Sequence, residues 1–494
     1  MKSVPKDLVA DWLLKIGYFP ESNVLPPSFE SSNLSLQDKP FNRDISSLAR
    51  RELATISYPR SLLSSRVFAS QHPWNYHDIV FYLHQHWDAV LDKLFNEDLR
   101  IYSYSMPIPV TKRDDRHLSN LRAGRMIYEW VRMAENDLVL DATYYKCIAK
   151  TDITNFYASV YTHSIAWALE GRDNAFQDRQ CSLVGNKIDK LIQYANDART
   201  NGIPVGSALS DLIAEIVLSD VDARVSNALR DLDFVAVRFK DDYRVLCQSE
   251  EDAQKFLRTL SFELGKVNLI LNEKKTTISD LPDGLYRAHD REYFPHSLRE
   301  RESISFKAFE HTLLIALDIH RKYPGTSILE KFLSELLTAG NRLKIRFAKQ
   351  REIKSRQIKK LFSLIFLAKR ESEKLLGNAL AIIELVYLDN VRAFDELKPY
   401  LSSIIKTELR RSSEKASAFE VVWLIFFSRY LGLGITGFED LVKNETINDN
   451  LYVKSMLFSK NKLFAEANIN LFVAPSECRG ERLVDRLDVF KKNA

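Results

Sequence analysis

The spacing of hydrophobic residues changes twice along the chain, near residues 140 and 303. Between about 140 and 285, short runs of β-prone residues alternate with stretches whose apolar residues recur every three or four positions. Beyond about 303 we find no convincing strand signal, and amphipathic stretches follow one another, as over residues 375–387. The pattern therefore predicts an α+β region followed by an all-α region, which is either an α-solenoid or an irregular helical bundle.

The amino-terminal stretch follows neither pattern. Scattered prolines and a serine-rich segment from Ser28 to Ser35 interrupt helical periodicity, and we expect an irregular arm over residues 1–60. From about 60 to 140 the pattern is helical, with a break at residues 106–109. We place one domain over residues 61–300 and a helical domain over residues 301–494.

The central block can be divided further. Residues 144–151 predict a strand that ends at Asp152, and residues 202–207 predict a tight loop that leads into a helix. Two β-rich runs, 234–239 and 243–247, flank the pair Asp241-Asp242, which is typical of a hairpin with carboxylates at its tip. A capping box at residues 249–252 then predicts a helix that ends at Gly265. This order of elements indicates a small α+β palm.

Composition and charge narrow the class of protein. The chain has 494 residues, 45% of them hydrophobic, with 15 Gly and 15 Pro, which excludes a disordered chain, a collagen and a small disulfide scaffold. A net charge of +4 is nearly balanced, so any basic surface must be local. Four scattered cysteines without a C-x-x-C pair favour a reducing cytoplasm. The longest apolar run, residues 421–427, is far shorter than the roughly 20 residues that span a bilayer, so we expect no membrane contact.

Three carboxylates in the palm predict a metal site. Joining a nucleotide to a hydroxyl uses two divalent ions about 3.5–4 Å apart, and magnesium prefers oxygen ligands. If the strand before Asp152 neighbours the hairpin that carries Asp241 and Asp242, the three carboxylates meet at one edge of the sheet. The competing interpretation is a solvated turn, as we expect for the second aspartate pair at residues 114–115.

Four segments in this order resemble the motifs of reverse transcriptases. Residues 150–157 (Lys-Thr-Asp-Ile-Thr-Asn-Phe-Tyr) resemble motif A, and residues 202–210 resemble motif B. Residues 239–242 (Phe-Lys-Asp-Asp) resemble motif C, and residues 271–276 (Leu-Asn-Glu-Lys-Lys-Thr) resemble motif D. The segment after motif A, residues 157–165, is similar to that of the bacterial abortive-infection reverse transcriptases, the Abi polymerases of phage defence.

The resemblance implies a fold and an activity. Abi enzymes combine reverse-transcriptase-like fingers and palm with an α-helical, HEAT-like carboxyl-terminal domain. They polymerise deoxynucleoside triphosphates without a template, start on a protein hydroxyl so that the single-stranded DNA product is covalently attached, and assemble as homo-oligomers. The resemblance thus implies that this chain is an antiphage enzyme of the bacterial cytoplasm, encoded by the bacterium or by a prophage. It also implies Mg²⁺ as the cofactor, with Mn²⁺ as the alternative ion.

The resemblance also assigns roles to single residues. Asp152, Asp241 and Asp242 match the catalytic metal ligands. Tyr157 matches the steric gate that excludes a ribose 2′-hydroxyl, with a buried core tyrosine as the alternative interpretation. Lys275 matches the general acid of motif D, although Lys274 beside it is an equally flexible cation.

Other candidate substrate contacts are less specific. Gly206 lies in the motif B loop and is a candidate for the nucleotide site. Lys112 and Arg116 lie where a fingers subdomain would reach the triphosphate, and cations suit phosphate oxygens. The alternative for these two is a mixed-sign solvated surface.

Two departures from the family pattern bear on templating. Val205 stands where many templated enzymes carry a glutamine near the nucleotide and the template. Phe239-Lys240 replaces the tyrosine and small apolar residue that usually precede the two aspartates. Both changes favour synthesis without a template. A conventional RNA-templated DNA polymerase and a catalytically silent scaffold that binds a phage or host protein remain the alternatives.

Two further features concern the product and the primer. Nine Lys and Arg residues between 342 and 360 face a single acidic residue, Glu352, and can track a single strand, unless they form a solvated helix or an oligomer contact. Tyr18, Ser31 and Ser32 in the arm are candidate priming hydroxyls by position alone.

Overall fold

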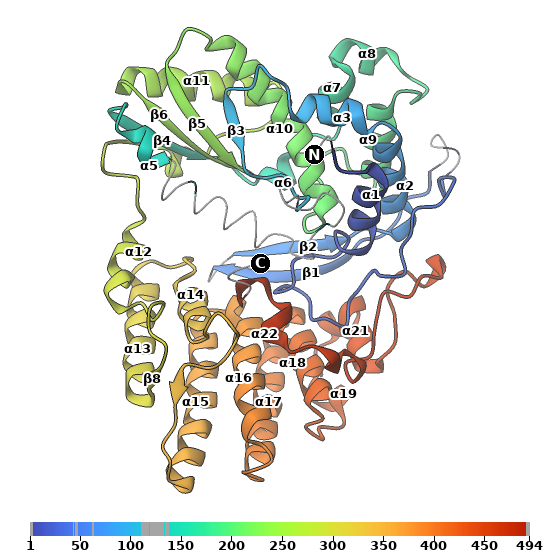
Figure 1. Ribbon diagram of the computed structural model, residues 1–494. Helices are drawn as coiled ribbons and strands as arrows, with labels where there is room; N and C mark the ends of the chain where they lie inside the picture. The colour runs from blue at the N-terminus through green and yellow to red at the C-terminus, as the bar shows by residue number, and fades with distance from the viewer. Residues whose placement is uncertain are drawn as a thin grey trace.

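A sheet-containing half and a helical half make up the molecule, with a long hairpin between them (Figure 1). The computed structural model describes residues 3–42, 44, 48–61, 64–109, 118, 133 and 138–490. No helix within these ranges is long and apolar enough to cross a membrane. The predicted α+β architecture with a helical carboxyl-terminal half is confirmed.

The central sheet has five strands in the order β3-β5-β6-β4-β7. They are β3 (Ile101–Ser103), β4 (Cys147–Asp152), β5 (Phe234–Phe239), β6 (Asp242–Cys247) and β7 (Thr277–Asp280). The β3–β5 pair is parallel and the other pairs are antiparallel. The predicted strand before Asp152 and the predicted hairpin are therefore both present, and they are direct neighbours because β4 pairs with β6.

Two long helices of the sheet-containing half begin at serine caps, of which the one at Ser249 was predicted. Helix α10 (Ala208–Ala228) begins after Ser207, whose Oγ accepts the N–H of Ser210, and α11 (Glu250–Gly265) begins after Ser249, whose Oγ accepts the N–H of Asp252. Among the described residues, the shorter helical elements of this half are α2 (Pro73–Gln85), α3 (Trp87–Leu94), α5 (Leu138–Ala142), α6 (Phe156–Ser159), α7 (His163–Glu170), α8 (Arg172–Gln177), α9 (Val184–Ala195) and η3 (Glu273–Lys275).

The amino-terminal arm is more ordered than the sequence predicts. Residues Lys6–Lys15 form helix α1, which buries Val9, Leu13 and Leu14. Two strands, β1 (Ala54–Ser61) and β2 (Ser64–Ser70), form a hairpin where we expected first arm and then helix. The missed signal is the alternation in residues 54–58, where Ala54, Ile56 and Tyr58 point to one face of the ribbon.

The helical half forms a row of helices below the hairpin in Figure 1. Its helices are α12 (Ala288–Tyr293), α13 (Phe306–Lys322), α14 (Ile328–Glu335), α15 (Arg351–Glu371), α16 (Leu376–Asn390), α17 (Leu397–Glu414), α18 (Ala418–Leu431), α19 (Phe438–Leu441), α20 (Glu445–Asn448), α21 (Leu451–Phe458) and α22 (Leu483–Arg486). Its 3-10 turns are η4 (Phe294–His296), η5 (Glu373–Leu375), η6 (Ala465–Ala467), η7 (Glu477–Gly480) and η8 (Asp488–Phe490).

Two expectations about this half are wrong in detail. A pair of two-residue strands, β8 (Ile304–Ser305) and β9 (Ile345–Arg346), is present where we expected helices alone. Helix α16 is buried on nearly every side instead of being amphipathic, because α14, α15, α18 and α22 surround it.

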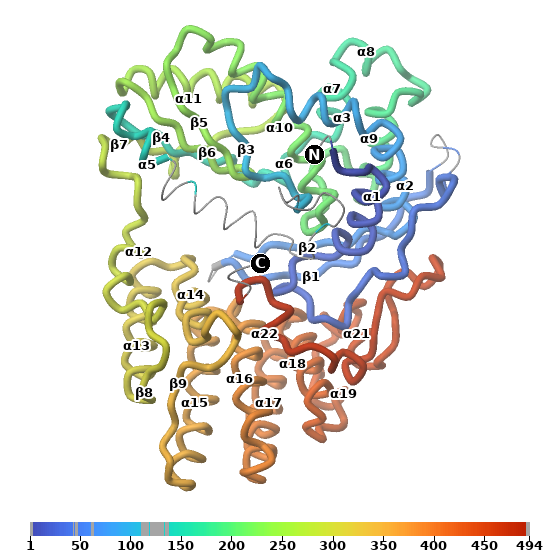
Figure 2. The backbone as a smooth tube through the Cα atoms, in the orientation of Figure 1, coloured from blue at the N-terminus to red at the C-terminus, as the bar shows by residue number. Residues whose placement is uncertain are grey.

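The β1–β2 hairpin lies between the two halves, as the tube in Figure 2 shows, and contacts both. On the helical side, the Tyr452 hydroxyl of α21 donates to Ser70 Oγ at 2.7 Å, and the ring of Tyr58 packs edge-on against Phe419 of α18. On the other side, the N–H of Ala69 donates to the carbonyl of Val205 at 2.8 Å. The hairpin therefore joins the helical half to the loop before α10.

Candidate functional site

The carboxylates predicted to meet lie at one end of the β4–β6 pair. Asp152 ends β4 and stands directly opposite Asp242, the first residue of β6. Paired residues of an antiparallel ladder present their side chains on the same face. The N–H of Ile153 donates to the Asp241 carbonyl at 3.1 Å, which fixes the hairpin tip beside the end of β4.

Burial, with repulsion between the carboxylates, raises the pKa values of two of these carboxyls. Partial burial raises the pKa of Asp241, and the charge of Asp152 adds to this effect. Desolvation raises the pKa of Asp242 to about 6, with further contributions from Asp241 and Asp152. Asp242 is an exposed residue, whereas Asp152 is only 5% exposed. The group is thus an incompletely neutralised cluster of negative charge.

Lys275 is the cation in direct contact with this cluster. Its Nζ forms an ion pair with Asp152 Oδ2, while its side chain is 53% exposed. The segment is held against β4 because the N–H of Asn272 donates to the Asp152 carbonyl at 2.8 Å and Thr276 Oγ1 lies 2.7 Å from Thr151 Oγ1. Lys274, the alternative candidate, is exposed beside it.

The side chains suit divalent cations by their chemistry. Asp152 Oδ1 is buried and has no hydrogen-bond partner among the described residues, which is unusual for a charged oxygen. An oxygen-only donor set matches the preference of Mg²⁺. Within the described ranges, no group of three or more His, Cys, Asp or Glu side chains already has the arrangement of a metal site. The three aspartates are therefore neighbours that a cation would have to draw together.

Tyr157 lies on α6, next to the end of β4. The side chain is 9% exposed, and its hydroxyl donates to Asp211 Oδ1 at 2.5 Å. Burial and the nearby Asp211 carboxylate raise the pKa of Tyr157 well above its usual value, so the hydroxyl stays protonated as a donor. This placement suits a ring held in one orientation, and the sugar-gating role stays a prediction.

The motif B loop is pinned from two sides. The N–H of Ile203 donates to the Tyr157 carbonyl at 2.8 Å, and the Val205 carbonyl accepts from β2. Gly206 has a φ of +130°, and a Cβ there would lie 2.9 Å from Phe68 Cδ1. The structure thus gives Gly206 a packing reason to be glycine, and its contact with a nucleotide stays a prediction.

Several sequence candidates fall elsewhere. Lys112, Arg116 and the aspartate pair at 114–115 lie outside the described residues. Tyr18 is 1% exposed and donates to the Gln71 carbonyl, and Ser31 is 2% exposed, so the expectation of an accessible hydroxyl is wrong at both. Ser32 is exposed.

The basic run between residues 342 and 360 is partly neutralised. Lys344 is 5% exposed and donates to the Leu298 carbonyl at 2.7 Å, which removes it from any surface. Lys360 pairs with Glu310, and Lys359 lies 3.8 Å from Glu396. Acidic residues distant in sequence therefore neutralise part of this run, and its contact with a single strand stays a prediction.

Sequence reasoning missed a buried charge cluster under the same hairpin. Arg238 is fully buried and donates to Asp222 at 2.8 Å and to Glu215 at 2.8 and 2.9 Å. Tyr243 donates its hydroxyl to Asp222 at 3.0 Å. A detectable signal was Arg238 itself, a charged residue inside an apolar strand run.

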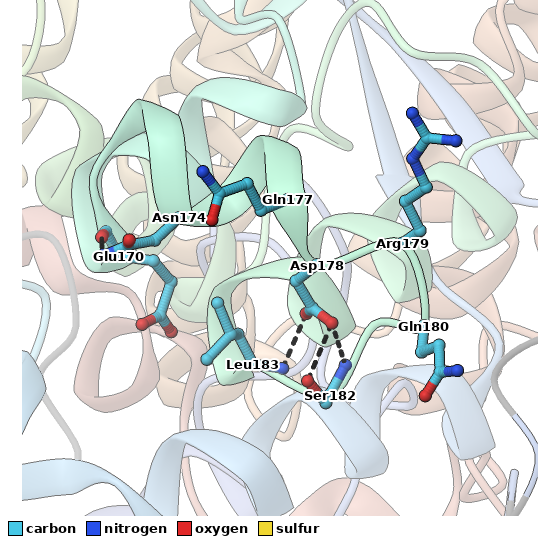
Figure 3. A pocket seen from close by; sticks show the side chains of 8 residues that line it. All are labelled: Glu170, Asn174, Gln177, Asp178, Arg179, Gln180, Ser182 and Leu183. Carbon is cyan, nitrogen blue, oxygen red and sulfur yellow. Dashed lines mark hydrogen bonds between the residues drawn. The ribbon is translucent and has the colours of Figure 1, made fainter.

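A wide polar depression lies away from the carboxylates, between α8 and the start of α9 (Figure 3). Its volume is about 620 Å³, and its wall includes Glu170, Gln177 and Arg179. Asp178 in this wall accepts from the N–H groups of Ser182 and Leu183, so its carboxylate is engaged in shaping the loop. The depression contains none of the residues predicted for catalysis.

A family model matches the part of the chain that contains the central sheet. Residues 92–309 match the model of the family described as reverse transcriptase (RNA-dependent DNA polymerase). No curated protein matches the chain.

Solved structures add a loose likeness. Apo telomerase from Candida tropicalis is 13% identical, with 83% of this chain and 69% of that chain covered and a TM-score of 0.35. Its form truncated from the C-terminal domain is 15% identical, with 45% and 48% covered and a TM-score of 0.29. Telomerase from Candida albicans with a fragment of telomeric RNA is 13% identical, with 70% and 63% covered and a TM-score of 0.29.

At such low identities and TM-scores, the likeness to telomerase says nothing about the activity or the partners of this chain. The chain spans 48–69% of the length of the three structures. The family match covers the strands and the helices that hold Asp152, Asp241, Asp242 and Lys275. Residues 92–309 therefore match a reverse transcriptase domain of the RNA-dependent DNA polymerase type.

Proposed function

We propose that the chain is an antiphage DNA polymerase of reverse transcriptase type that adds deoxynucleotides without a template and starts on a protein hydroxyl. The observation that carries the polymerase assignment is the juxtaposition of Asp152 with Asp242 beside the hairpin tip at Asp241. Oδ1 of Asp152, which has no hydrogen-bond partner within the described ranges, is a site where a cation would be stabilised.

In this proposal Asp152, Asp241 and Asp242 hold the magnesium ions. When bound, these ions activate the attacking hydroxyl and stabilise the charge of the triphosphate. Lys275 donates a proton to the departing pyrophosphate, a role that fits a half-exposed ammonium tethered at the edge of the site. Tyr157 packs against the sugar of the incoming nucleotide and disfavours a 2′-hydroxyl.

Template independence draws support from the motif B loop. Val205 supplies no polar side chain there, and its carbonyl already accepts the N–H of Ala69 from β2. Phe68 of the same strand packs against Gly206. The hairpin thus occupies one side of the loop that resembles the template-contacting loop of templated enzymes. The antiphage role and the covalently attached product follow from the resemblance to the Abi polymerases.

One experiment tests these statements together. The purified protein is incubated with labelled deoxynucleotides and Mg²⁺ alone, and the product is then treated with protease or with nuclease. We expect label that remains on the polypeptide after denaturation, is lost on nuclease treatment, and is released as a short nucleic acid-peptide by protease. Chelation of the metal should abolish incorporation.

Matched variants make the result specific. Asp241→Ala should abolish incorporation with the fold intact, because a metal ligand is lost at an edge that contributes little to the core. Asp231→Ala, an exposed aspartate of the same domain, should behave as the wild type. Dependence on an added RNA template and primer would refute the template-free proposal, and absence of incorporation under every condition would favour the silent scaffold.

A further inference from the structure

The turn that carries the motif C aspartates has an unusual lysine. Lys240 and Asp241 join β5 to β6, and Lys240 has a φ of +53°, a left-handed conformation that residues other than glycine seldom adopt. Its N–H donates to Ser105 Oγ, and its carbonyl accepts from Arg238 Nη1 at 3.2 Å. Its backbone is therefore held at both polar groups, and its side chain extends toward α10.

That direction leads to Asp211, in the first turn of α10. Lys240 Nζ lies 3.3 Å from Asp211 Oδ2, and the other oxygen of the same carboxylate accepts from the Tyr157 hydroxyl at 2.5 Å. The side chains of Lys240 and Asp211 are 21% and 12% exposed. One carboxylate thus connects the motif C turn to the aromatic side chain of motif A.

The ring of Tyr157 packs against the ring of Phe156, with the ring centroids 5.1 Å apart. Ser105, Asp211 and Lys240 form the polar end of the surroundings of this ring. The bond from the Tyr157 hydroxyl to Asp211 adds a directional contact to this packing and so helps to set the orientation of the ring.

We propose that Asp211 and Lys240 are positioning residues that hold Tyr157 against the nucleotide sugar and thereby set the discrimination between deoxyribonucleotides and ribonucleotides. Lys240 keeps the Asp211 carboxylate aligned, and Asp211 holds the hydroxyl of Tyr157. The inference rests on the proposed polymerase function. It assigns a role to Lys240, which stands where the family usually carries a small apolar residue.

The test compares kcat/KM for a deoxynucleoside triphosphate with that for its ribose counterpart. Lys240→Met removes the charge with little loss of volume, and we expect the deoxy-over-ribo ratio to fall about tenfold, the scale of a loosened steric selection. Asp211→Asn should lower the ratio by a similar factor. Lys240→Arg keeps the positive charge and should therefore keep most of the wild-type ratio. Lys255→Met, an exposed lysine on α11, should keep the wild-type ratio.

The outcomes separate the two proposals. If the wild type incorporates no nucleotide, the polymerase function fails and this inference fails with it. If the wild type polymerises but the ratio is the same in Lys240→Met, Asp211→Asn and wild type, with normal melting curves for all three, the positioning role is overturned and the polymerase function stands. A purely structural role would lower stability and leave the ratio unchanged.

Discussion

Two charged clusters share the β5–β6 hairpin, and they are built in opposite ways. Beneath the sheet, the buried Arg238 is bonded to Asp222 and to both oxygens of Glu215. At the hairpin tip, Lys275 pairs with one oxygen of Asp152, and the other oxygen is buried without a hydrogen-bond partner among the described residues.

The difference separates a structural cluster from a chemical one. Burying an ion pair costs much desolvation energy and is tolerated when the hydrogen bonds are complete, as they are at Arg238. At the tip the carboxylates lack a complete set of hydrogen-bond partners, so their burial does not stabilise the fold. We therefore expect substitutions in the buried cluster to affect folding and substitutions at the tip to affect turnover.

The largest expected effect is on turnover. Asp152→Asn should lower kcat by about 10³-fold or more, because a lost metal ligand removes several kcal/mol of transition-state stabilisation. The matched change Asp222→Asn, in the buried cluster, should leave kcat per folded molecule within about tenfold of wild type. Incorporation assays with active-fraction correction check both. Equal losses in the two variants would erase the distinction between the clusters.

The next effect is on stability. Arg238→Met should lower the free energy of unfolding by about 3–5 kcal/mol, because two buried carboxylates lose their shared cation. Urea unfolding followed by circular dichroism measures the change, with Arg258→Met on the exposed face of α11 as the control, expected within about 0.5 kcal/mol of wild type. Should Arg238→Met be insoluble, Arg238→Lys tests the same point with a smaller loss. A wild-type unfolding curve would contradict the structural assignment.

The two lysines of motif D offer a third, smaller contrast. Lys275→Ala should lower kcat by about 10²-fold, at the low end of general-acid contributions, because Lys275 alone of the pair contacts Asp152. Lys274→Ala should lower it by less than about tenfold. Single-turnover kinetics with matched protein preparations distinguish the two, and a greater loss in Lys274→Ala would transfer the role to that residue.

The smallest effect is the pH dependence of stability. The folded-state pKa of Asp242, about 6, lies above the ordinary aspartate value, so the folded protein binds this proton more tightly than the unfolded chain does. The resulting destabilisation is therefore absent below about pH 4 and complete above about pH 6. Asp242→Asn should raise Tm at pH 8 by less than about 4 °C, since an exposed charge is worth about 1 kcal/mol or less. The gain should vanish at pH 4, and equal gains at both pH values would contradict the shift.

Local patterns in the sequence determined much of the palm. The strand before Asp152, the hairpin around Asp241 and the capped helix at Ser249 each follow from residues close together in the chain. The sequence predicted that the three aspartates would meet only if β4 and β6 were neighbours. The structure shows that these two strands pair directly.

Only the tertiary structure decided the remaining features, because they depend on contacts between residues far apart in the sequence. Tyr18 could not be recognised as buried until the arm packed beneath Gln71, and Lys360 could not be recognised as paired until Glu310 lay beside it. The shared use of Asp211 by Tyr157 and Lys240 spans three separate elements. Periodicity reports which face of an element is apolar, whereas the partner of a polar side chain is fixed only when the elements meet.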